Sequence, residues 1–479
     1  MIGLRYLLKE GAKEQAAVDL LTTLVKKSPY VGKVYIAGGY VRDELMGIDP
    51  KDIDLVIEMP KGGIEFAKWV TKELGIYSAS NPVIFSRFGT AKFNLRGVQH
   101  DGQDLSAIDI ECVMSRKEEY DAKSRKPKVS FGTLKQDVER RDFTTNSLLK
   151  NLTSGEILDL TGMGRDDIKK GIVRTPLDPD VIFADDPLRI LRAVRFTIKY
   201  NWTLPLWMIR AMSKNAHLLN TPKISAERIR DELNKMLVTG NPDKAIRLMQ
   251  ITGINKYVAP ELDTLVGLKQ NKYHKWDANK HTLEVLKGTP PDLKTRLAAL
   301  FHDIGKGTTK TVVDNEIHFY EHEDVGAEIA SDIMKRLKYP NDVIAPVTAA
   351  IKNHMRLKGS GMEGEVISDK SLRKLQVDLG DHLEMTLDLM HADNMSHADG
   401  FSMPKQIPNI RDRLKTVGVV KGKVKLPLTG NDIMAELKLQ PGAIIGKLLK
   451  VVEEAYFENP NITRTDALKL VKAAYRKMT

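Results

Sequence analysis

The sequence predicts an α/β N-terminal part with a small mixed sheet, followed by parts that are entirely helical. Two observations support this fold class. Up to about residue 165, apolar residues often alternate at the period of two that is typical of strands, whereas beyond it they recur at helical spacing almost throughout. In addition, 479 residues exceed what one hydrophobic core usually serves, so we expect about three or four packed units.

The N-terminal part is predicted to begin with a helix at residues 5–27, where leucines and alanines recur at helical spacing. Strands are predicted at residues 34–37, 52–58, 90–95 and 107–113. The last two strands are joined by the Gly- and Asp-rich segment 97–104, which is typical of a hairpin. Together these strands account for the small sheet.

The remaining chain is predicted to be helical, with few interruptions. Helices are predicted at about residues 185–200, 205–219, 225–239, 243–252, 280–287, 294–304 and 323–337. Segment 359–365 contains three glycines and is interpreted as an exposed loop.

Charge and cysteine content restrict the class of protein. A net charge of +11 and a pI near 9.2 favour a polyanionic partner such as nucleic acid. Residues 401–479 carry 15 Lys and Arg against 7 Asp and Glu, and Lys421, Lys423 and Lys425 are either RNA-backbone contacts or part of a solvated basic face. The single cysteine, Cys112, excludes an intrachain disulfide. With no run of about 18 apolar residues, we expect a cytoplasmic protein.

A glycine turn is followed by two closely spaced aspartates. Gly38 and Gly39 end a predicted strand, and backbone N–H groups at such a turn can approach a phosphate to which Arg42 adds charge. Asp52 and Asp54 lie on one face of the next strand, roughly 6–7 Å apart along the chain. Two such carboxylates can hold a pair of Mg²⁺ ions for in-line phosphoryl transfer. A tight turn and a solvated strand edge are the structural alternatives.

A third acid for such a metal site should come from a neighbouring strand. Asp109 and Glu111 alternate toward one face of the predicted strand at 107–113, so either of them is a candidate.

The combination of Gly-Gly-x-Val-Arg-Asp with Asp-x-Asp resembles the first motif of the polymerase-β nucleotidyltransferase superfamily. Within it, the sequence is similar to class II tRNA nucleotidyltransferases, which include the CCA-adding enzymes, and to bacterial poly(A) polymerases. The resemblance implies that Asp52 and Asp54 are the catalytic Mg²⁺ ligands. It also implies triphosphate contacts from Gly38, Gly39 and Arg42.

Two further motifs resemble the nucleotide-binding motifs of this family. Arg140-Arg141-Asp142-Phe143-Thr144-Thr145-Asn146-Ser147 is similar to its Arg-Arg-Asp-Phe-Thr-x-Asn-Ala motif. The resemblance implies that Asp142 contacts the ribose, that Arg141 neutralises phosphate and that Asn146 belongs to the nucleotide site. A charged helix start capped by Asp142 is the alternative.

Asp185-Asp186-Pro187-Leu188-Arg189-Ile190-Leu191-Arg192 resembles the family's Glu-Asp-x-x-Arg motif. It implies that Asp186 and Arg189 present donors and acceptors to the base edges of CTP and ATP, with Arg192 nearby. Because a proline follows Asp186, this residue also suits a helix N-cap, and one oxygen can cap while the other faces the base. The segments 159–164 and 225–232 resemble the hinge and neck motifs of the family, and we assign them supporting roles.

A second constellation of possible metal ligands follows the neck. Residues 300–306 resemble the HD phosphohydrolase signature. The implied ligands of a divalent metal of unknown identity are His281, His302, Asp303, His322, His354 and Asp393. Imidazole and carboxylate ligands together can activate water for phosphoester hydrolysis. Some CCA-adding enzymes use such a domain on 2′,3′-cyclic and related phosphates, and others keep it as a scaffold.

The resemblance covers nearly the whole chain and implies four domains. These are a polymerase-β-like nucleotidyltransferase head at 1–165, an all-α neck at 166–262, an HD domain at 263–400 and a basic helical tail at 401–479. The implied function is the addition of CMP and AMP to the 3′ end of tRNA, with tRNA, CTP and ATP as partners. A poly(A) polymerase, or an enzyme that adds only A or only CC, shares the same head motifs.

From another class, the chain could be an HD phosphohydrolase whose head only binds RNA, or an RNA-binding protein without catalysis. The presence of Asp52, Asp54, Asp142 and Arg189 together argues against the first of these alternatives, and only the net charge favours the second. The oligomeric state is not predicted by the sequence.

Overall fold

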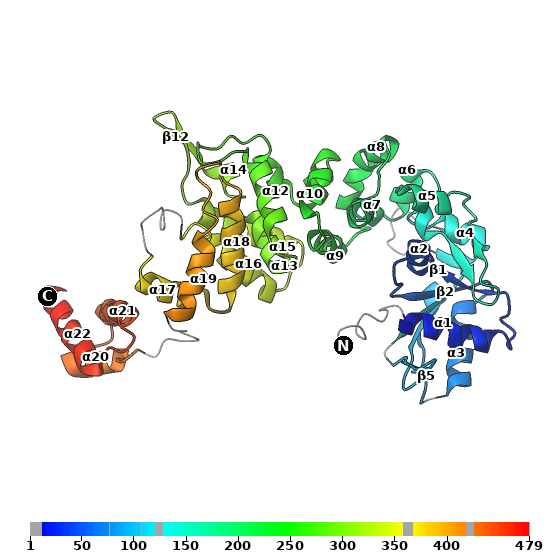
Figure 1. The fold of residues 1–479 in the computed structure, drawn as a ribbon, viewed down its shortest axis with the longest axis horizontal. Helices are drawn as coiled ribbons and strands as arrows, with labels where there is room; N and C mark the ends of the chain where they lie inside the picture. The colour runs from blue at the N-terminus through cyan, green and yellow to red at the C-terminus, as the bar shows by residue number, and fades with distance from the viewer. Residues whose placement is uncertain are drawn as a thin grey trace, which may run out of the picture. The chain divides into compact units, whose positions relative to one another are not determined.

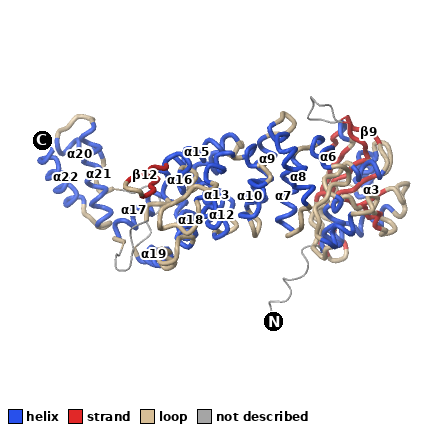
Figure 2. The backbone as a smooth tube through the Cα atoms, turned by 90° about the horizontal axis from the view of Figure 1, so that it is seen from above, coloured by secondary structure: helices blue, strands red, loops and turns tan. Residues whose placement is uncertain are grey.

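The computed structural model describes residues 12–75, 77–106, 108–119, 128–357, 367–417 and 426–478. The chain forms two compact units, one of residues 1–236 with 247–258 and the other of residues 237–246 with 259–479. Strands gather in the first unit, and helices make up most of the second, as Figures 1 and 2 show. The predicted α/β part followed by helical parts is confirmed.

The first unit contains a seven-stranded mixed sheet with the order β11-β10-β1-β2-β7-β4-β3. Its strands are β1 (Val34–Ala37), β2 (Ile53–Ile57), β3 (Val83–Phe85), β4 (Thr90–Asn94), β7 (Asp109–Met114), β10 (Leu149–Asn151) and β11 (Ile157–Leu158). The pair β2 and β7 is parallel, and every other neighbouring pair is antiparallel. The predicted pairing of 90–95 with 107–113 is thus confirmed as the antiparallel pair β4 and β7.

Two small antiparallel pairs flank this sheet. They are β5 (Gln99–His100) with β6 (Gln103–Asp104), and β8 (Arg116–Glu119) with β9 (Lys128–Phe131). The segment between β8 and β9 lies outside the described residues.

Helices α1 (Ala12–Val25) and α3 (Gly62–Leu74) supply much of the core of this unit. Leu21 and Phe66 pack with the sheet residues Ile36 and Leu55, and all four are fully or almost fully buried. The predicted helix at 5–27 is observed from Ala12 on, and its start lies outside the described residues. A second, smaller core lies around Tyr35, with α4 (Leu134–Glu139) contributing to it.

The other helices of the first unit lie around and after the sheet. They are α2 (Gly39–Leu45), α5 (Gly164–Lys170), α6 (Pro179–Asp185), α7 (Leu188–Tyr200), α8 (Leu206–Asn215), α9 (Ala226–Leu237), α10 (Pro242–Ile251, which both units share) and α11 (Asn255–Val258). The single helix predicted at 185–200 is wrong at its start. Asp186 is extended, with φ −139° and ψ 96°, and it separates α6 from α7.

The second unit carries the helices that surround the HD signature. They are α12 (Ala278–Gly288), α13 (Leu293–Phe301), α14 (Lys306–Thr309), α15 (His322–Arg336), α16 (Asn341–Asn353), α17 (Asp369–Leu379), α18 (Leu383–Met395) and α19 (Gln406–Thr416). The structure also contains an unpredicted antiparallel hairpin of β12 (Lys310–Val313) and β13 (Glu316–Phe319). Asp314 and Asn315 turn it with φ values of 50° and 61°, the left-handed geometry that two-residue hairpin turns require.

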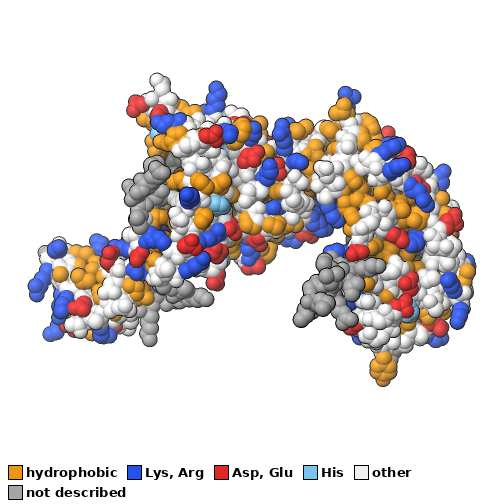
Figure 3. All heavy atoms as spheres, viewed as in Figure 1, with side chains coloured by type: hydrophobic (Ala, Val, Ile, Leu, Met, Phe, Trp, Pro, Cys, Tyr) orange, Lys and Arg blue, Asp and Glu red, His pale blue; other side chains and the backbone are white. Residues whose placement is uncertain are grey.

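The chain ends in three helices with a core of their own. They are α20 (Gly430–Leu437), α21 (Ala443–Glu458) and α22 (Arg464–Met478), packed around Leu448 and Val452. Lysine and arginine side chains are spread over the surface of this part in Figure 3. The loop predicted at 359–365 and the lysines Lys421, Lys423 and Lys425 lie outside the described residues. Within the described ranges, no helix has the length and apolarity to span a membrane.

Candidate functional sites

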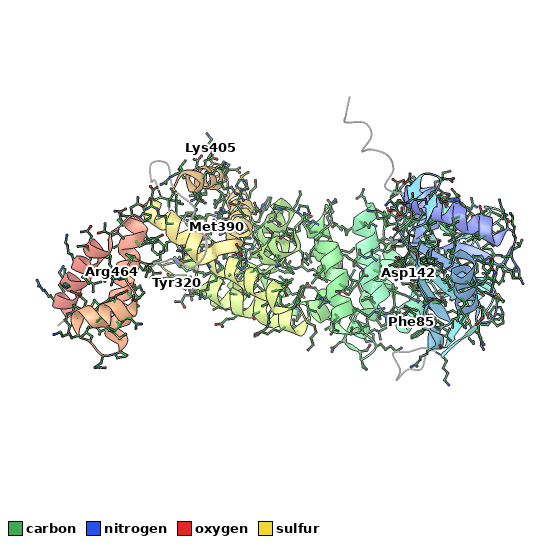
Figure 4. All side chains as sticks on the ribbon, turned by 90° about the horizontal axis from the view of Figure 1, so that it is seen from below. Phe85, Asp142, Tyr320, Met390, Lys405 and Arg464 are labelled. Atoms are coloured by element: carbon green, nitrogen blue, oxygen red, sulfur yellow. The ribbon has the colours of Figure 1, made fainter. Side chains whose placement is uncertain are left out.

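A cavity of about 530 Å³ in the first unit brings the predicted head residues together. Its lining includes Gly38, Gly39, Arg42, Asp52, Asp54, Arg141, Asp142, Asn146, Asp186, Arg189 and Arg192. The lining comes from the turn after β1, the start of β2, the segment after α4 and the first turns of α7. Figure 4 shows Asp142 where the sheet meets the helices that follow it. Neither Asp109 nor Glu111 is among the lining residues.

The turn between β1 and α2 needs glycine for steric reasons. Gly38 has a φ of 68°, in the left-handed region that residues with a side chain rarely adopt. A Cβ on Gly38 would also lie 3.4 Å from Nη1 of Arg141. The backbone of this turn therefore stays open to the cavity, as contact with a phosphate requires.

The parallel pairing of β2 with β7 places Asp54 opposite Glu111. Burial among protein atoms, with Glu111 and Asp52 adding negative charge, raises the pKa of Asp54 to about 6, although its side chain still reaches the cavity. Asp109 is instead held by Lys92, at 2.8 Å, and by Asn94, at 3.0 Å. Carboxylates crowded in this way fit a divalent cation, because its charge would relieve their repulsion.

Arg42 is buried, which rules out a surface arginine at the glycine turn. Its guanidinium lies over the rings of Phe196 and Tyr200, 5.2 and 4.9 Å from their centroids. It also donates to Oδ1 of Asn146 at 2.6 Å and to Oδ1 of Asp43 at 2.7 Å. The turn after β1 is therefore tied to α7, which carries both rings.

Asp142 accepts hydrogen bonds at both of its oxygens. Oδ1 accepts from the backbone N–H of Phe143 at 2.8 Å and from Asn146 at 2.9 Å. Oδ2 accepts from Nε and Nη2 of Arg192, at 2.8 and 2.6 Å. Burial alone would raise the pKa of Asp142, but Arg192 and Asn146 outweigh it and lower the pKa to about 2.

Asp186 and Arg189 are both engaged by the protein itself. The expected capping contact is present, since Oδ1 of Asp186 accepts from the backbone N–H of Leu188 at 3.2 Å. Oδ2 accepts from Arg228 at 2.8 Å. Arg189 is 8% exposed and donates to the carbonyls of Arg140, at 2.6 Å, and Ile182, at 3.2 Å. These bonds fix the side chains at the cavity wall.

The second unit brings the six predicted HD residues together from α12, the turn after α13, the start of α15, the end of α16 and α18. They form two groups whose ligand atoms lie within 4.8 Å of one another, namely His281 with His302 and Asp393, and Asp303 with His322 and His354. All six are buried. Oδ1 of Asp393 lies 3.0 Å from Nε2 of His281.

Three of these histidines are oriented by backbone carbonyls. The Nδ1 atoms of His302, His322 and His354 lie 2.8, 2.9 and 2.6 Å from the carbonyl oxygens three residues earlier. The three Nε2 atoms face Asp303 at 3.3 to 3.8 Å and have no hydrogen-bond partner within the described part of the chain. Imidazoles fixed at Nδ1, with Nε2 turned toward a carboxylate, fit divalent metal ligation.

Lys306 is a buried residue of this site that the sequence did not single out as a contact. Its Nζ donates to Oδ2 of Asp303 at 2.7 Å and to Gln270 at 2.8 Å. Burial raises the pKa of Asp303, but His302 and Lys306 outweigh it and hold the pKa well below its usual range. Asp303 is therefore an ionised carboxylate, as a metal ligand must be.

Three family descriptions match successive parts of the chain. The poly A polymerase head domain matches residues 34–174, and a probable RNA and SrmB-binding site of polymerase A matches residues 208–265. The HD domain matches residues 280–386.

Sequence relatives cover more of the chain. The multifunctional CCA protein of Neisseria gonorrhoeae is 31% identical over 323 residues, which span 64% of this chain and 70% of that protein. This chain belongs to the tRNA nucleotidyltransferase family. The CC-adding tRNA nucleotidyltransferase of Thermus thermophilus is 29% identical over 90% of this chain and 91% of that protein.

Some family members share only part of their length with this chain. The mitochondrial CCA tRNA nucleotidyltransferase of Saccharomyces cerevisiae is 33% identical over 48% of this chain and 43% of that protein. The chain thus spans about half the length, or less, of several curated tRNA nucleotidyltransferases that it matches.

A solved member of the tRNA nucleotidyltransferase family has the same fold. The CCA-adding enzyme of Bacillus stearothermophilus, crystallised in complex with CTP, aligns with a TM-score of 0.65 over 98% of this chain and 99% of that chain. The two are 20% identical, so the likeness concerns the fold alone.

Two buried acids beside the nucleotidyltransferase cavity were not predicted as site residues. Asp137 accepts from Arg140 at 2.7 Å and from Arg141 at 2.9 Å, so it orients both arginines of the Arg-Arg-Asp motif. The spacing of three and four residues is the signal that could have revealed it. Glu232 accepts from Arg195 at 2.6 Å and belongs to the neck motif.

Proposed function

We propose that this chain adds CMP and AMP to the 3′ end of tRNA in the cavity of the first unit. One observation carries the proposal, namely that the glycine turn, Asp52, Asp54, Asp142 and Arg189 all line one cavity. Triphosphate, metal, ribose and base contacts therefore have side chains of the required chemistry within reach of a single nucleotide. The relatives named as CCA and CC-adding enzymes support the same reaction class.

In the proposed mechanism, Asp52 and Asp54 would hold Mg²⁺, with Glu111 as the third acid in preference to Asp109. Bound Mg²⁺ would supply charge that lowers the pKa of the attacking 3′-hydroxyl and stabilises the leaving pyrophosphate. Glu111 is favoured because it lies opposite Asp54 on the paired strand, whereas Asp109 is engaged by Lys92. The turn at Gly38 and Gly39, with Arg141, would hold the triphosphate.

Selection of the nucleotide is assigned to three side chains that lie at or near the start of α7. Asp142 would accept a hydrogen bond from the ribose, and Asp186 and Arg189 would read the base edges. Asp186 can do so by releasing Arg228, whose side chain is 47% exposed and can swing away. Base selection by fixed protein groups explains how an enzyme could add a defined sequence without a nucleic-acid template.

The test is extension of a tRNA that lacks CCA, with Mg²⁺ and with CTP and ATP alone and in combination. We expect two C additions with CTP alone and one further A with both nucleotides. Long A tails without C would show a poly(A) polymerase and reject the proposal. Addition of A only to a tRNA that already ends in CC, or of CC only, would identify an enzyme with half of the reaction.

We propose a second, hydrolytic centre at the HD residues. Its support is that six buried side chains converge in two groups, each of two histidines and one aspartate. Such a set of ligands suits one or two divalent ions. Such ions would activate a water for attack on a phosphoester. Hydrolysis of p-nitrophenyl phosphate and of a 2′,3′-cyclic nucleotide, with Mn²⁺, Ni²⁺, Co²⁺ or Mg²⁺ added singly, tests this activity. An absence of hydrolysis with all four metals would leave the HD part as a scaffold.

The four-domain division and a cytoplasmic location also stay proposals. The division is supported by the separate family matches at 34–174, 208–265 and 280–386. The location is supported by the single, buried cysteine, since such a chain needs no oxidising compartment. Cell fractionation with an antibody would test it.

A further inference from the structure

We propose that Glu232 is a positioning residue that sets the preference of the site for ribonucleotides over deoxyribonucleotides. The inference rests on the proposed function, in which Asp142 contacts the ribose of the incoming nucleotide. Glu232 lies on α9 and is not among the residues that line the cavity. Its influence would therefore pass through Arg192 and Asp142.

Glu232 is a buried carboxylate held by arginines of α7. It is 3% exposed, and its Oε2 accepts from Nε of Arg195 at 2.6 Å. Its Oε1 lies 3.8 Å from Nη1 of Arg192. Nζ of Lys235, whose side chain is 59% exposed, also lies 3.9 Å from Oε1. A buried carboxylate is tolerated only with such partners, and the two guanidinium groups are the more buried of its three cations.

Arg192 lies between two carboxylates. Its Nε and Nη2 bind Oδ2 of Asp142, while its Nη1 faces Glu232. These two acids and Asp186 raise the pKa of Arg192, with Asp142 contributing most. Because a guanidinium is a rigid planar fork, acids on two of its sides fix its orientation. The orientation of Arg192 in turn fixes the position of Asp142, because Arg192 donates two hydrogen bonds to Oδ2 of Asp142.

Positive charge on α7 makes this arrangement depend on Glu232. The guanidinium groups of Arg42, Arg192 and Arg195 all lie over the ring of Phe196, at 5.2, 5.6 and 4.8 Å from its centroid. Without the charge of Glu232, Arg195 loses this carboxylate and Arg192 keeps only Asp142, so the repulsion between the two guanidinium groups is less well offset. Arg192 would then move, and Asp142 with it.

A displaced Asp142 should mainly weaken the hydrogen bond with the 2′-hydroxyl of the incoming nucleotide. A site built to hydrogen-bond a hydroxyl rejects the analogue that lacks it, and this rejection requires a well-directed acceptor. Oδ1 of Asp142 is already used by Phe143 and Asn146, and Oδ2 by Arg192. The direction left for a ribose hydroxyl is thus set by where Arg192 holds this carboxylate.

The experiment compares CTP with dCTP in the extension of a tRNA that lacks CCA. In Glu232→Gln, we expect the ratio of kcat/KM for CTP to kcat/KM for dCTP to fall on the order of 5- to 20-fold. A change of this size lies within the range that the coupling between contacting groups produces. The KM for CTP should rise, while kcat with saturating CTP and the KM for tRNA stay within about twofold. Asp231→Asn is the matched control, because Asp231 is 54% exposed and pairs with its neighbour Arg230.

A double-mutant cycle separates positioning from general damage to the fold. If Glu232 acts through Asp142, then Glu232→Gln in an Asp142→Asn background should lower the ratio no further. A Glu232→Asp variant keeps the charge and withdraws the carboxylate by one methylene, so it should lower the ratio less than Glu232→Gln. If Glu232→Gln does not fold, this variant carries the same comparison.

Several outcomes would overturn the inference. One is an unchanged CTP-to-dCTP ratio of kcat/KM in folded Glu232→Gln or Glu232→Asp. Another is a further fall of this ratio when Glu232→Gln is added to Asp142→Asn. A wild-type enzyme that extends tRNA equally well with CTP and dCTP would remove the ribose role of Asp142 and this inference with it, while leaving the transfer reaction standing. A wild type that extends no tRNA would reject the proposed function itself.

Discussion

At Asp142, burial and ion pairing act on the same carboxylate in opposite directions. Burial favours the neutral acid, whereas Arg192 and Asn146 favour the charged form and prevail, so the pKa falls to about 2. Asp54 shows the opposite balance, because burial and the neighbouring acids together raise its pKa to about 6. One acid is thus stabilised in its charged form by the protein, and the other is left for a cation to stabilise.

The lowered pKa of Asp142 predicts how its contribution to stability depends on pH. With a pKa near 2 when folded and near 3.9 when unfolded, its ionisation contributes about 2 to 3 kcal/mol, fully present above roughly pH 5. This stability is lost as the pH falls from about 4 toward 2. Urea unfolding of the wild type and of Asp142→Asn should differ most at pH 7 and converge below pH 4. A difference that stays constant down to pH 3 would contradict the pairing with Arg192.

Most residues of the candidate site could be predicted from the sequence. The exceptions depend on contacts between strands or helices that are distant in the sequence. The eleven residues predicted from the head and neck motifs for the nucleotide and its metal all line the cavity, because short motifs keep their members at fixed places on a strand, turn or helix. The choice between Asp109 and Glu111 could not be made, because it depends on the register between β2 and β7 and on Lys92 in β4. The packing of Arg42 against α7 was hidden for the same reason.

At the scale of elements, helix α3 is held against the sheet by a close approach at Gly63. A Cβ there would lie 2.5 Å from the carbonyl oxygen of Cys112 and 2.6 Å from that of Gly89. These are backbone atoms of, or next to, the strands β7 and β4, and they cannot move without disturbing the sheet. The sheet in turn carries Asp54, so this packing supports the site.

We therefore expect Gly63→Ala to destabilise the first unit by about 1 to 3 kcal/mol, the usual cost of overpacking. The control is Gly446→Ala in the first turn of α21, where an added Cβ meets nothing within 4 Å. That change should stabilise by up to about 1 kcal/mol, since alanine favours helices over glycine. Calorimetric unfolding of both variants measures the sign of each change in stability. An unchanged stability of Gly63→Ala would show that α3 can shift freely.

Two elements departed from the sequence expectations for identifiable physical reasons. The hairpin of β12 and β13 was missed among helical periods, although Asp314 and Asn315 between β-branched residues are a recognisable turn signal. The helix predicted at about 185–200 begins three residues later, at Leu188, which agrees with the capping role expected of Asp186 before the proline. Long periodic helices such as α15 were predicted nearly to the residue.

At the scale of the whole molecule, two sets of candidate metal ligands lie in two separate compact units. The head cavity belongs to residues of the first unit, and the HD ligands belong to the second. Each set is supported by its own buried partners, Asp137 for the first and Lys306 for the second. We therefore expect the two centres to fail independently.

The HD centre should lose its metal when one ligand is removed. His302→Ala deletes a buried ligand of one of the two groups, so the divalent metal retained by the purified protein, measured by elemental analysis, should fall by at least half relative to the wild type. His382→Ala is the control, because His382 lies in the same unit outside the cluster. Equal metal content in wild type and His302→Ala would reject the ligand assignment. Extension of tRNA should be unaffected by either change.

The most direct test of nucleotidyl transfer in the head cavity is the extension assay on Asp52→Ala. With a tRNA lacking CCA, Mg²⁺, CTP and ATP, the wild type should build the full end, and Asp52→Ala should lose at least about a thousandfold in rate, as expected when a metal ligand in phosphoryl transfer is removed. Metal binding and any hydrolysis at the HD residues should remain at the wild-type level. Extension by Asp52→Ala at a rate near that of the wild type would contradict the account.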